Sequence, residues 1–521
     1  MGSFRTSVLI LLILGSVLFE TVSARAAEIE SAKAYFSQAV EAHWKWELDK
    51  AIQLYTRSLA LDANNARAYF NRGVAYRSKG DDDRALADFT QAISKDPGMV
   101  DAVYGRGLIY LHRKAYDKAL EDMDRVIQLD SKHSGAYRVR GEAQIGLGNF
   151  SGALADLNEA LALYPPDSET YYLRAIAYQK TQNPEKARKD LDKTLELNPK
   201  HVGARVKLAN FLFADGNAKK AVEEYNRAIN LDPNNAEAFN NRGWAKATLG
   251  NLNEAIADLT RALELDPKFA MALSNRAAVY RKMDRNDAAL ADYNRLIELN
   301  SSDPAVYVAR GTTRLDLGRA ADAIKDFDRA LEYQPQEPSI LALRGRAKVL
   351  VNQYKEAIPD LTTALKADPD NVDALTYRGR AYEGVQSYKE AIRDFSRAIE
   401  ASPSATADMY YSLGKNYLLN GNFDNAIEVL TKVIRMQPGH GLSYANRGVA
   451  YKEKGEYERA AEDFRKALPL LKEQPRIAKV GQFLNEAEKR IQASRRPSSL
   501  PLIPPNSLDT ETQPSVENRY W

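Results

Sequence analysis

The sequence contains no cysteine, few histidines and no excess of either charge. Without cysteine, its 521 residues have no disulfide, thiolate nucleophile, cysteine-based zinc site or lipidated cysteine. The 73 basic and 70 acidic side chains nearly balance, whereas a general nucleic-acid binder presents a basic stripe. No phosphate-binding loop, nucleophile elbow or zinc-protease motif occurs. The five histidines are interpreted as surface residues, and neither a metal nor a cofactor is expected.

One 34-residue pattern, seen clearly at Ala66–Met99, occupies most of the chain. It occurs in thirteen copies from Ala32 to Gln474, with one extra residue near Ser404. Position 8 is always Gly or Ala, position 20 is always Ala, and position 32 is Pro in nine copies. Apolar positions 4, 8 and 11 share one helical face, and positions 17 to 30 show a second apolar face. Each copy therefore predicts a helical hairpin whose two small residues let the backbones approach closely.

The small residues at 8 and 20, the apolar residue at 24 and the closing proline resemble the tetratricopeptide repeat (TPR) family. The resemblance implies an all-α, right-handed superhelical solenoid, because one hairpin cannot bury its apolar face alone. A capping helix is expected at 475–493, after the last repeat. The expected helix-turn-helix repeats are 32–65, 66–99, 100–133, 134–167, 168–201, 202–235, 236–269, 270–303, 304–337, 338–371, 372–405, 407–440 and 441–474.

The two ends of the chain read differently from the repeats. Residues 1–26 resemble a signal peptide, with Arg5, a short apolar core and a small-x-small cleavage site, followed by a short segment at 27–31. An uncleaved anchor is the alternative, although the apolar run is shorter than the ~18 residues that span a bilayer. Residues 494–521 contain five prolines and predict a disordered tail. We therefore expect an exported protein, periplasmic or secreted, without a stable membrane anchor after cleavage.

Arginine at position 7 and aspartate at position 23 occur together in ten copies. In the other three copies both are missing, so the two residues are expected to form a bidentate bridge between the helices of one hairpin. The pairs are Arg72/Asp88, Arg106/Asp122, Arg140/Asp156, Arg174/Asp190, Arg242/Asp258, Arg276/Asp292, Arg310/Asp326, Arg344/Asp360, Arg378/Asp394 and Arg447/Asp463.

The sequence predicts a binding protein rather than an enzyme, because the residues outside the repeats are fewer than the ~100 of a modal domain. In the proteins it resembles, positions 2, 5, 9, 12 and 13 of the first helices line a concave groove. The residues expected there are Phe36, His43, Trp44, Phe70, Tyr104, Arg138, Tyr172, Asn210, Asn240, Trp244, Arg281, Arg346, Arg380 and Tyr411. Their mixture of aromatic, Asn and Arg side chains suits adaptable contacts.

Two functions remain open. The first is a non-enzymatic scaffold that binds a protein or peptide partner and no nucleic acid. The alternative is a polysaccharide-binding or secretion-guiding solenoid of a cell-envelope export system. Trp44 bears on this choice, because it is either part of an atypical first repeat that caps the array or an aromatic ligand contact.

Overall fold

The computed structural model describes residues 25, 27–163, 167–300 and 302–495, and within these ranges every regular element is a helix. The chain divides into two compact units, Met1–Leu249 and Gly250–Trp521, which we describe separately. Arg25 is the one described residue of the predicted signal peptide, and the predicted tail beyond Arg495 also lies outside the described residues.

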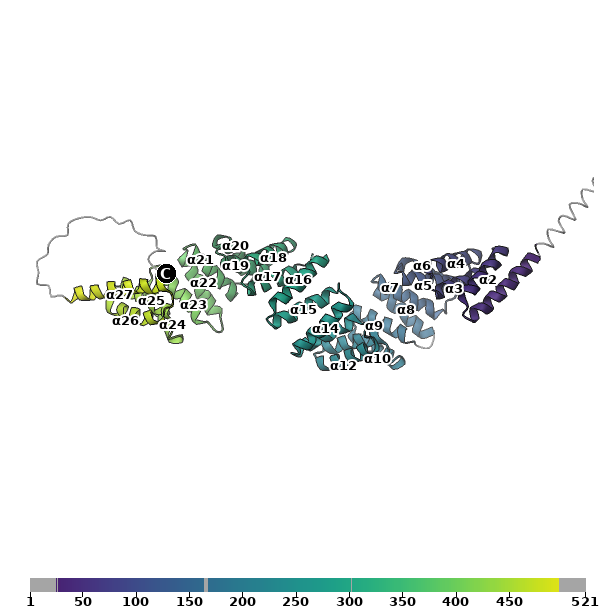
Figure 1. Ribbon diagram of the computed structural model, residues 1–521, viewed down its shortest axis with the longest axis horizontal. Coiled ribbons are helices and arrows are strands. Elements are labelled where there is room, and N and C mark those ends of the chain that lie inside the picture. Colours follow the sequence, from purple (N-terminus) through teal and green to yellow (C-terminus); the bar gives the residue numbers. More distant parts are fainter. Residues whose placement is uncertain (1–24, 26, 164–166, 301, 496–521) are drawn as a thin grey trace, which may run out of the picture. The chain divides into compact units, whose positions relative to one another are not determined.

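The first unit begins with a helix at 27–44 and continues with helices α2 to α13 (Figure 1). Its helices are α2 (Leu48–Leu61), α3 (Ala66–Ser78), α4 (Asp82–Lys95), α5 (Val100–His112), α6 (Tyr116–Leu129), α7 (Ser134–Gly146), α8 (Phe150–Leu163), α9 (Ser168–Lys180), α10 (Pro184–Leu197), α11 (Val202–Ala214), α12 (Ala218–Leu231) and α13 (Ala236–Thr248).

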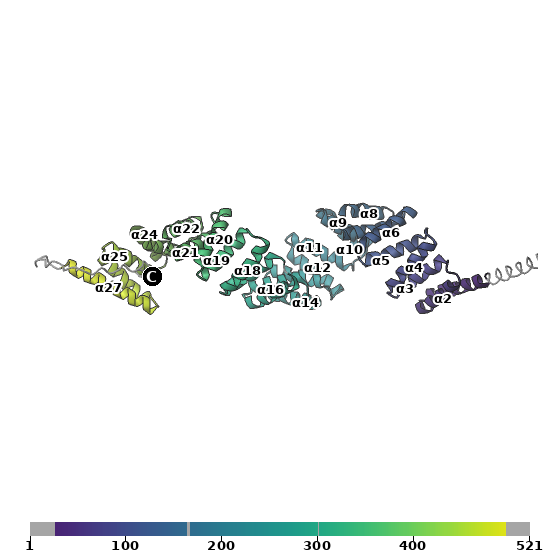
Figure 2. The ribbon, with the colours of Figure 1, turned by 90° about the horizontal axis from the view of Figure 1, so that it is seen from above.

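The second unit contains helices α14 to α27 and one short 3₁₀ helix (Figure 2). They are α14 (Leu252–Leu265), α15 (Ala270–Lys282), α16 (Asn286–Asn300), α17 (Pro304–Asp316), α18 (Ala320–Tyr333), α19 (Pro338–Leu350), α20 (Tyr354–Ala367), α21 (Val372–Gly384), α22 (Tyr388–Ala401), α23 (Ala407–Leu419), α24 (Phe423–Met436), α25 (Gly441–Glu453), α26 (Tyr457–Ala467), η1 (Leu468–Leu470) and α27 (Gln474–Ser494).

The turn inside each hairpin has one fixed backbone conformation. Position 15 adopts a positive φ in all thirteen copies. Glycine, which has no Cβ to clash in this region, occupies seven of these sites. The other six are Trp46, Lys114, Gln182, Asp284, Asn352 and Gln386. Since the left-handed region costs an L-residue ~1 kcal/mol or more, the fold imposes this turn even where the sequence does not favour it.

The small residue at position 8 lies against the large side chain at position 24 of the same hairpin. A Cβ added to Gly73 would lie 2.9 Å from the ring of Phe89, and one added to Gly345 would lie 2.6 Å from Cγ of Leu361. Phe89 and Leu361 are themselves almost fully buried. The close approach of the two helices predicted from the sequence is thus explained by a specific contact.

The predicted bridge forms in all nine arginine–aspartate pairs that lie within one unit. In the pair Arg276–Asp292, Nε donates to one carboxylate oxygen at 2.9 Å and Nη2 to the other at 2.7 Å. Seven other pairs have the same arrangement, and in the ninth pair Nε of Arg310 is shared between both oxygens of Asp326 while Nη2 donates to Oδ1. Arg242 and Asp258 belong to different units, and their bridge stays a prediction.

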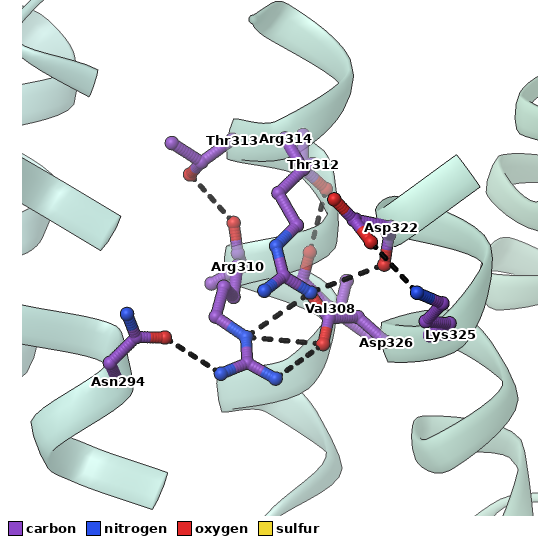
Figure 3. Close-up of polar contacts among 10 residues, drawn as sticks. Asn294, Val308, Arg310, Thr312, Thr313, Arg314, Asp322, Lys325 and Asp326 are labelled. Carbon is purple, nitrogen blue, oxygen red and sulfur yellow. Dashed lines mark hydrogen bonds and ion pairs between the residues drawn. The ribbon is translucent and has the colours of Figure 1, made fainter. Parts of the chain in front are cut away.

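The same arginines also contact the preceding repeat, which the sequence pattern did not reveal. In nine of the ten copies, Nη1 donates to a Thr, Asn or Asp side chain at position 25 of the preceding repeat, which lies on the second helix of that repeat. Figure 3 shows one such contact, in which Arg310 binds Asp326 of its own hairpin and donates to Asn294 at 2.8 Å. The eight arginines for which both contacts are described therefore each join three helices.

The sixth repeat replaces the bridge instead of losing it. Leu208 occupies position 7, and the sequence therefore predicts no bridge to Glu224. In the structure, Glu224 accepts from Nη1 of Arg205 at 3.0 Å, and both side chains are largely buried. Arg205 lies one turn before Leu208 on α11, so a cation still reaches the position-23 carboxylate.

The predicted C-terminal capping helix is present as α27, which packs against α26. Val480 and Ala487 are buried, as their spacing indicates. Phe483 is also buried, and its ring centroid lies 5.9 Å from that of Phe464.

We expect Arg276→Ala to destabilise the second unit strongly, because Asp292 is only 4% exposed and would lose its counter-ion. Breaking a buried pair costs ~3–5 kcal/mol, against ~0–1 kcal/mol for an exposed one. The matched control is Arg261→Ala, whose partner Glu264 is well exposed. Urea unfolding should separate the two variants, and an absence of coupling between Arg276 and Asp292 in a double-mutant cycle would contradict the interpretation.

Gly345→Ala should also destabilise the protein, by ~1–3 kcal/mol, because its Cβ would overlap Leu361. The control is Gly481→Ala on α27, where an added Cβ meets nothing within 4 Å. This second change should stabilise the helix by ~0.5–1 kcal/mol, since alanine is the better helix former. The same sign for both substitutions in thermal unfolding would rule out the close-packing argument.

Candidate binding surface

First helices of neighbouring hairpins contact one another directly. Such contacts join α5 with α7, α7 with α9 and α11 with α13 in the first unit, and α17 with α19, α19 with α21 and α23 with α25 in the second. Successive second helices of the described residues make no comparable contact. We call positions 2, 5, 9, 12 and 13 of the first helices the first-helix face, because the predicted groove residues come from these positions.

The fourteen residues predicted to line a groove differ in exposure. Trp44 and Arg380 are exposed, Asn240 is buried, and the other eleven are half-buried. The half-buried ones are Phe36, His43, Phe70, Tyr104, Arg138, Tyr172, Asn210, Trp244, Arg281, Arg346 and Tyr411. Part of this set consequently serves the packing between repeats rather than an open surface.

Asn240 corrects the sequence interpretation most clearly. Its exposed fraction is 0%, and its amide donates to Oδ1 of Asn241 at 2.8 Å. Asn241 in turn donates to Asn210 in the preceding repeat at 3.0 Å. Replacing Asn240 would therefore disturb the packing between α11 and α13, and the expectation that the residue is free to bind a partner is wrong.

Position-5 tyrosines stack on position-34 histidines. The ring centroids are 4.7 Å apart for Tyr104 and His133, and 4.5 Å apart for Tyr172 and His201. Both histidines also cap the next helix, since Nδ1 accepts a backbone N–H at 3.0 and 3.1 Å respectively. The interpretation of these histidines as surface residues is therefore wrong; each one stabilises a junction between repeats.

A third position-34 histidine, His440, also contacts a position-5 tyrosine, and its ring centroid lies 4.8 Å from that of Tyr411. Burial lowers the pKa of His440, partly opposed by the charge of Asp408. Burial also raises the pKa of Tyr411 to about 12, so the phenol stays neutral and accepts a hydrogen bond from Asn446 at 3.2 Å.

A row of three cations, Arg346, Arg380 and Lys415, occupies position 9 on α19, α21 and α23. The sequence analysis named both arginines but missed Lys415. Lys415 falls at position 9 of the predicted repeat 407–440, the position that named both arginines, so the repeat pattern itself was sufficient to find it.

Beside this cation row lies a hollow of about 600 Å³, within the range of ligand sites. Tyr354, Tyr388 and Tyr411 contribute aromatic surface, and Glu383 and Ser412 contribute polar atoms. Glu383 is already engaged, because Lys415 lies 2.7 Å from one of its oxygens and Asn416 donates to the other at 2.6 Å.

A second hollow, of about 390 Å³, lies at the first repeat. It is lined by Val40, His43, Trp44, Trp46, Tyr55 and Asn71. Trp44 is 86% exposed and Trp46 is 70% exposed, which is unusual for side chains of this size. Burial lowers the pKa of His43 and raises that of Tyr55 to about 12, so both are neutral at pH 7.

The part of the chain that the structure describes lacks both a cluster of metal ligands and a membrane-spanning helix. No group of three or more His, Asp or Glu side chains there is arranged to hold a metal ion. Among the same residues, no helix combines the length and the apolar character needed to cross a bilayer.

Family models match nearly the whole repeat region. Models described as tetratricopeptide repeat match residues 66–99, 107–170, 168–201, 236–269, 272–303, 308–348, 343–406 and 411–475, and one described as TPR repeat matches 47–77 and 209–250. The chain belongs to the tetratricopeptide repeat family. TPR proteins are protein–protein interaction scaffolds and are typically not catalytic.

Solved TPR structures resemble parts of the chain. YrrB, described as a TPR protein with an unusual peptide-binding site, is 24% identical over 36% of this chain and 95% of its own, with a TM-score of 0.30. A chain of the APC/C hetero-tetramer Cut9–Hcn1 is 15% identical over 88% of this chain and 98% of its own, with a TM-score of 0.38. A TPR protein from Parabacteroides merdae is 21% identical over 55% of this chain and 98% of its own, with a TM-score of 0.35.

Proposed function

We propose that this TPR protein is an exported, non-enzymatic scaffold that binds a partner polypeptide on its first-helix face. The observation that carries the proposal is the cation row, whose two arginines lie on the first-helix face. The position-7 arginines of the same helices, in contrast, bind aspartates inside their own hairpins. Side chains of this kind are the ones on which interface energy usually concentrates. The export step rests on residues 1–26, which resemble a cleavable signal peptide ending at Ala26.

Site-specific photo-crosslinking in the native host tests the binding face. Met271 is 59% exposed at position 2 of the first helix α15, and Glu264 is exposed on the second helix α14. A photoreactive residue at 271 should crosslink to a partner protein, whereas the same residue at 264 should not. Equal crosslinking from both sites, or crosslinking from 264 alone, would place binding elsewhere on the molecule.

A second candidate function, polysaccharide binding, is favoured by the hollow at the first repeat. Exposed indole rings such as Trp44 and Trp46 offer flat apolar faces on which sugar rings can stack.

If the hollow binds polysaccharide, the mature protein should be retarded in native gels that contain a soluble envelope polysaccharide. Trp44→Ala should abolish most of that retardation without changing the fold, because the side chain is almost entirely in solvent. Leu147→Ala, which removes another exposed apolar side chain, is the control. Retardation that persists in Trp44→Ala would leave the polypeptide-binding function as the one supported.

A further inference from the structure

The arginines of the cation row differ from the position-7 arginines on the same helices. On α19 and α21, the position-7 residues Arg344 and Arg378 each bind an aspartate of their own hairpin through two hydrogen bonds. Two residues further on, Arg346 and Arg380 have no carboxylate within ion-pair distance among the described residues. The same two helices thus carry one satisfied and one unsatisfied row of guanidinium groups.

Tyr377 holds the two unsatisfied arginines in place. Its ring lies between them, with the guanidinium carbons of Arg346 and Arg380 each 5.3 Å from the ring centroid. Nε of Arg346 is shielded from solvent and has no hydrogen-bond partner in the described part of the chain. A buried donor without an acceptor is costly, and an incoming acceptor would remove that cost.

The charges that surround the row leave it positive. Glu383 is the carboxylate that faces it, and Glu383 is paired with Lys415 at 2.7 Å. Asp373 is exposed at the start of α21, two helical turns before Arg380. Lys348 on α19 and Arg314 on α17 lie at position 11, on the inner face of their helices, and are already bound to Asp360 and Asp326 at 2.7 Å. The two arginines therefore supply positive charge that no residue of the row neutralises.

The spacing of the row restricts the shape of a matching ligand. The helices α19 and α21 contact each other directly, and packed helices lie ~8–10 Å apart, so Arg346 and Arg380 follow one another at about that interval. A polypeptide in the polyproline II conformation repeats its side-chain direction every three residues and rises ~9 Å over them. Acidic side chains three residues apart in such a segment would meet the two arginines in turn.

We propose that Arg346 and Arg380 bind an extended segment of another protein that carries carboxylates three residues apart. Each arginine donates two hydrogen bonds to one carboxylate. The hollow lined by Tyr354, Tyr388 and Tyr411 receives the side chains that lie between the carboxylates. This inference rests on the proposed function, and it adds the chemical class and the repeat spacing of the partner.

The test uses the full chain from residue 27 and a fluorescein-labelled peptide in which the triplet glutamate-proline-alanine is repeated. Fluorescence anisotropy should show binding that weakens as salt rises, because exposed charge pairs are screened. A peptide with glutamine for glutamate, and one with the same glutamates placed side by side, should each bind at least about tenfold more weakly. Equal binding of either control peptide would overturn the assignment.

Variants locate the site on the protein. Arg346→Gln/Arg380→Gln should weaken binding of the triplet peptide at least about tenfold, while Arg346→Lys/Arg380→Lys should lose part of the affinity through loss of bidentate geometry. Lys355→Gln/Arg393→Gln removes the same charge from exposed positions on second helices and should bind as the wild type does. Should the first variant unfold, Arg380→Gln alone decides, because Arg380 is exposed.

The two levels of the proposal fail separately. If residue 271 crosslinks to a partner in the native host but the triplet peptide does not bind, the carboxylate assignment is wrong and the scaffold function stands. If neither experiment gives a signal, the first-helix face is not the binding surface.

Discussion

The arginine at position 7 is the interaction on which the rest of this structure depends. It binds the aspartate at position 23 through two hydrogen bonds, and in nine copies it also reaches the second helix of the preceding repeat. One guanidinium thereby sets the spacing inside a hairpin and the spacing to its neighbour. Asp292 is almost completely buried, so forming the contact removes its carboxylate from water. This desolvation is unfavourable, and the contact is stable only when all its hydrogen bonds form.

Other features of the hairpins follow from this contact. Arg276 lies 5.8 Å from the ring of Tyr280, and the corresponding arginines lie over aromatic rings in most other copies. Its bond to Asp292 raises the pKa of Arg276, although burial works in the opposite direction. In the ninth and tenth repeats a second cation, Arg314 or Lys348, joins the same carboxylate. The position-23 carboxylate is thus the fixed element, and the cations around it vary.

Arginine has two roles here, which are distinguished by a shift of two residues along one helix. At position 7 it points between helices and finds an internal carboxylate, while at position 9 it lies on the first-helix face and finds none among the described residues. Because an α-helix turns 100° per residue, two residues move a side chain by more than half a turn. The scaffold and the proposed carboxylate site are therefore built from the same residue type on the same helices.

The sequence by itself determined the repeat length, the pairs of helices, the close contact at position 8 and nearly every bridge, because these interactions recur at fixed separations within one hairpin. Contacts between hairpins were decided only by the tertiary structure. The link from Arg310 to Asn294, the burial of Asn240 and the stacking of Tyr104 on His133 depend on how one repeat packs on the next. The ion pair of Lys415 on α23 with Glu383 on α21 is another such contact, since it joins neighbouring repeats.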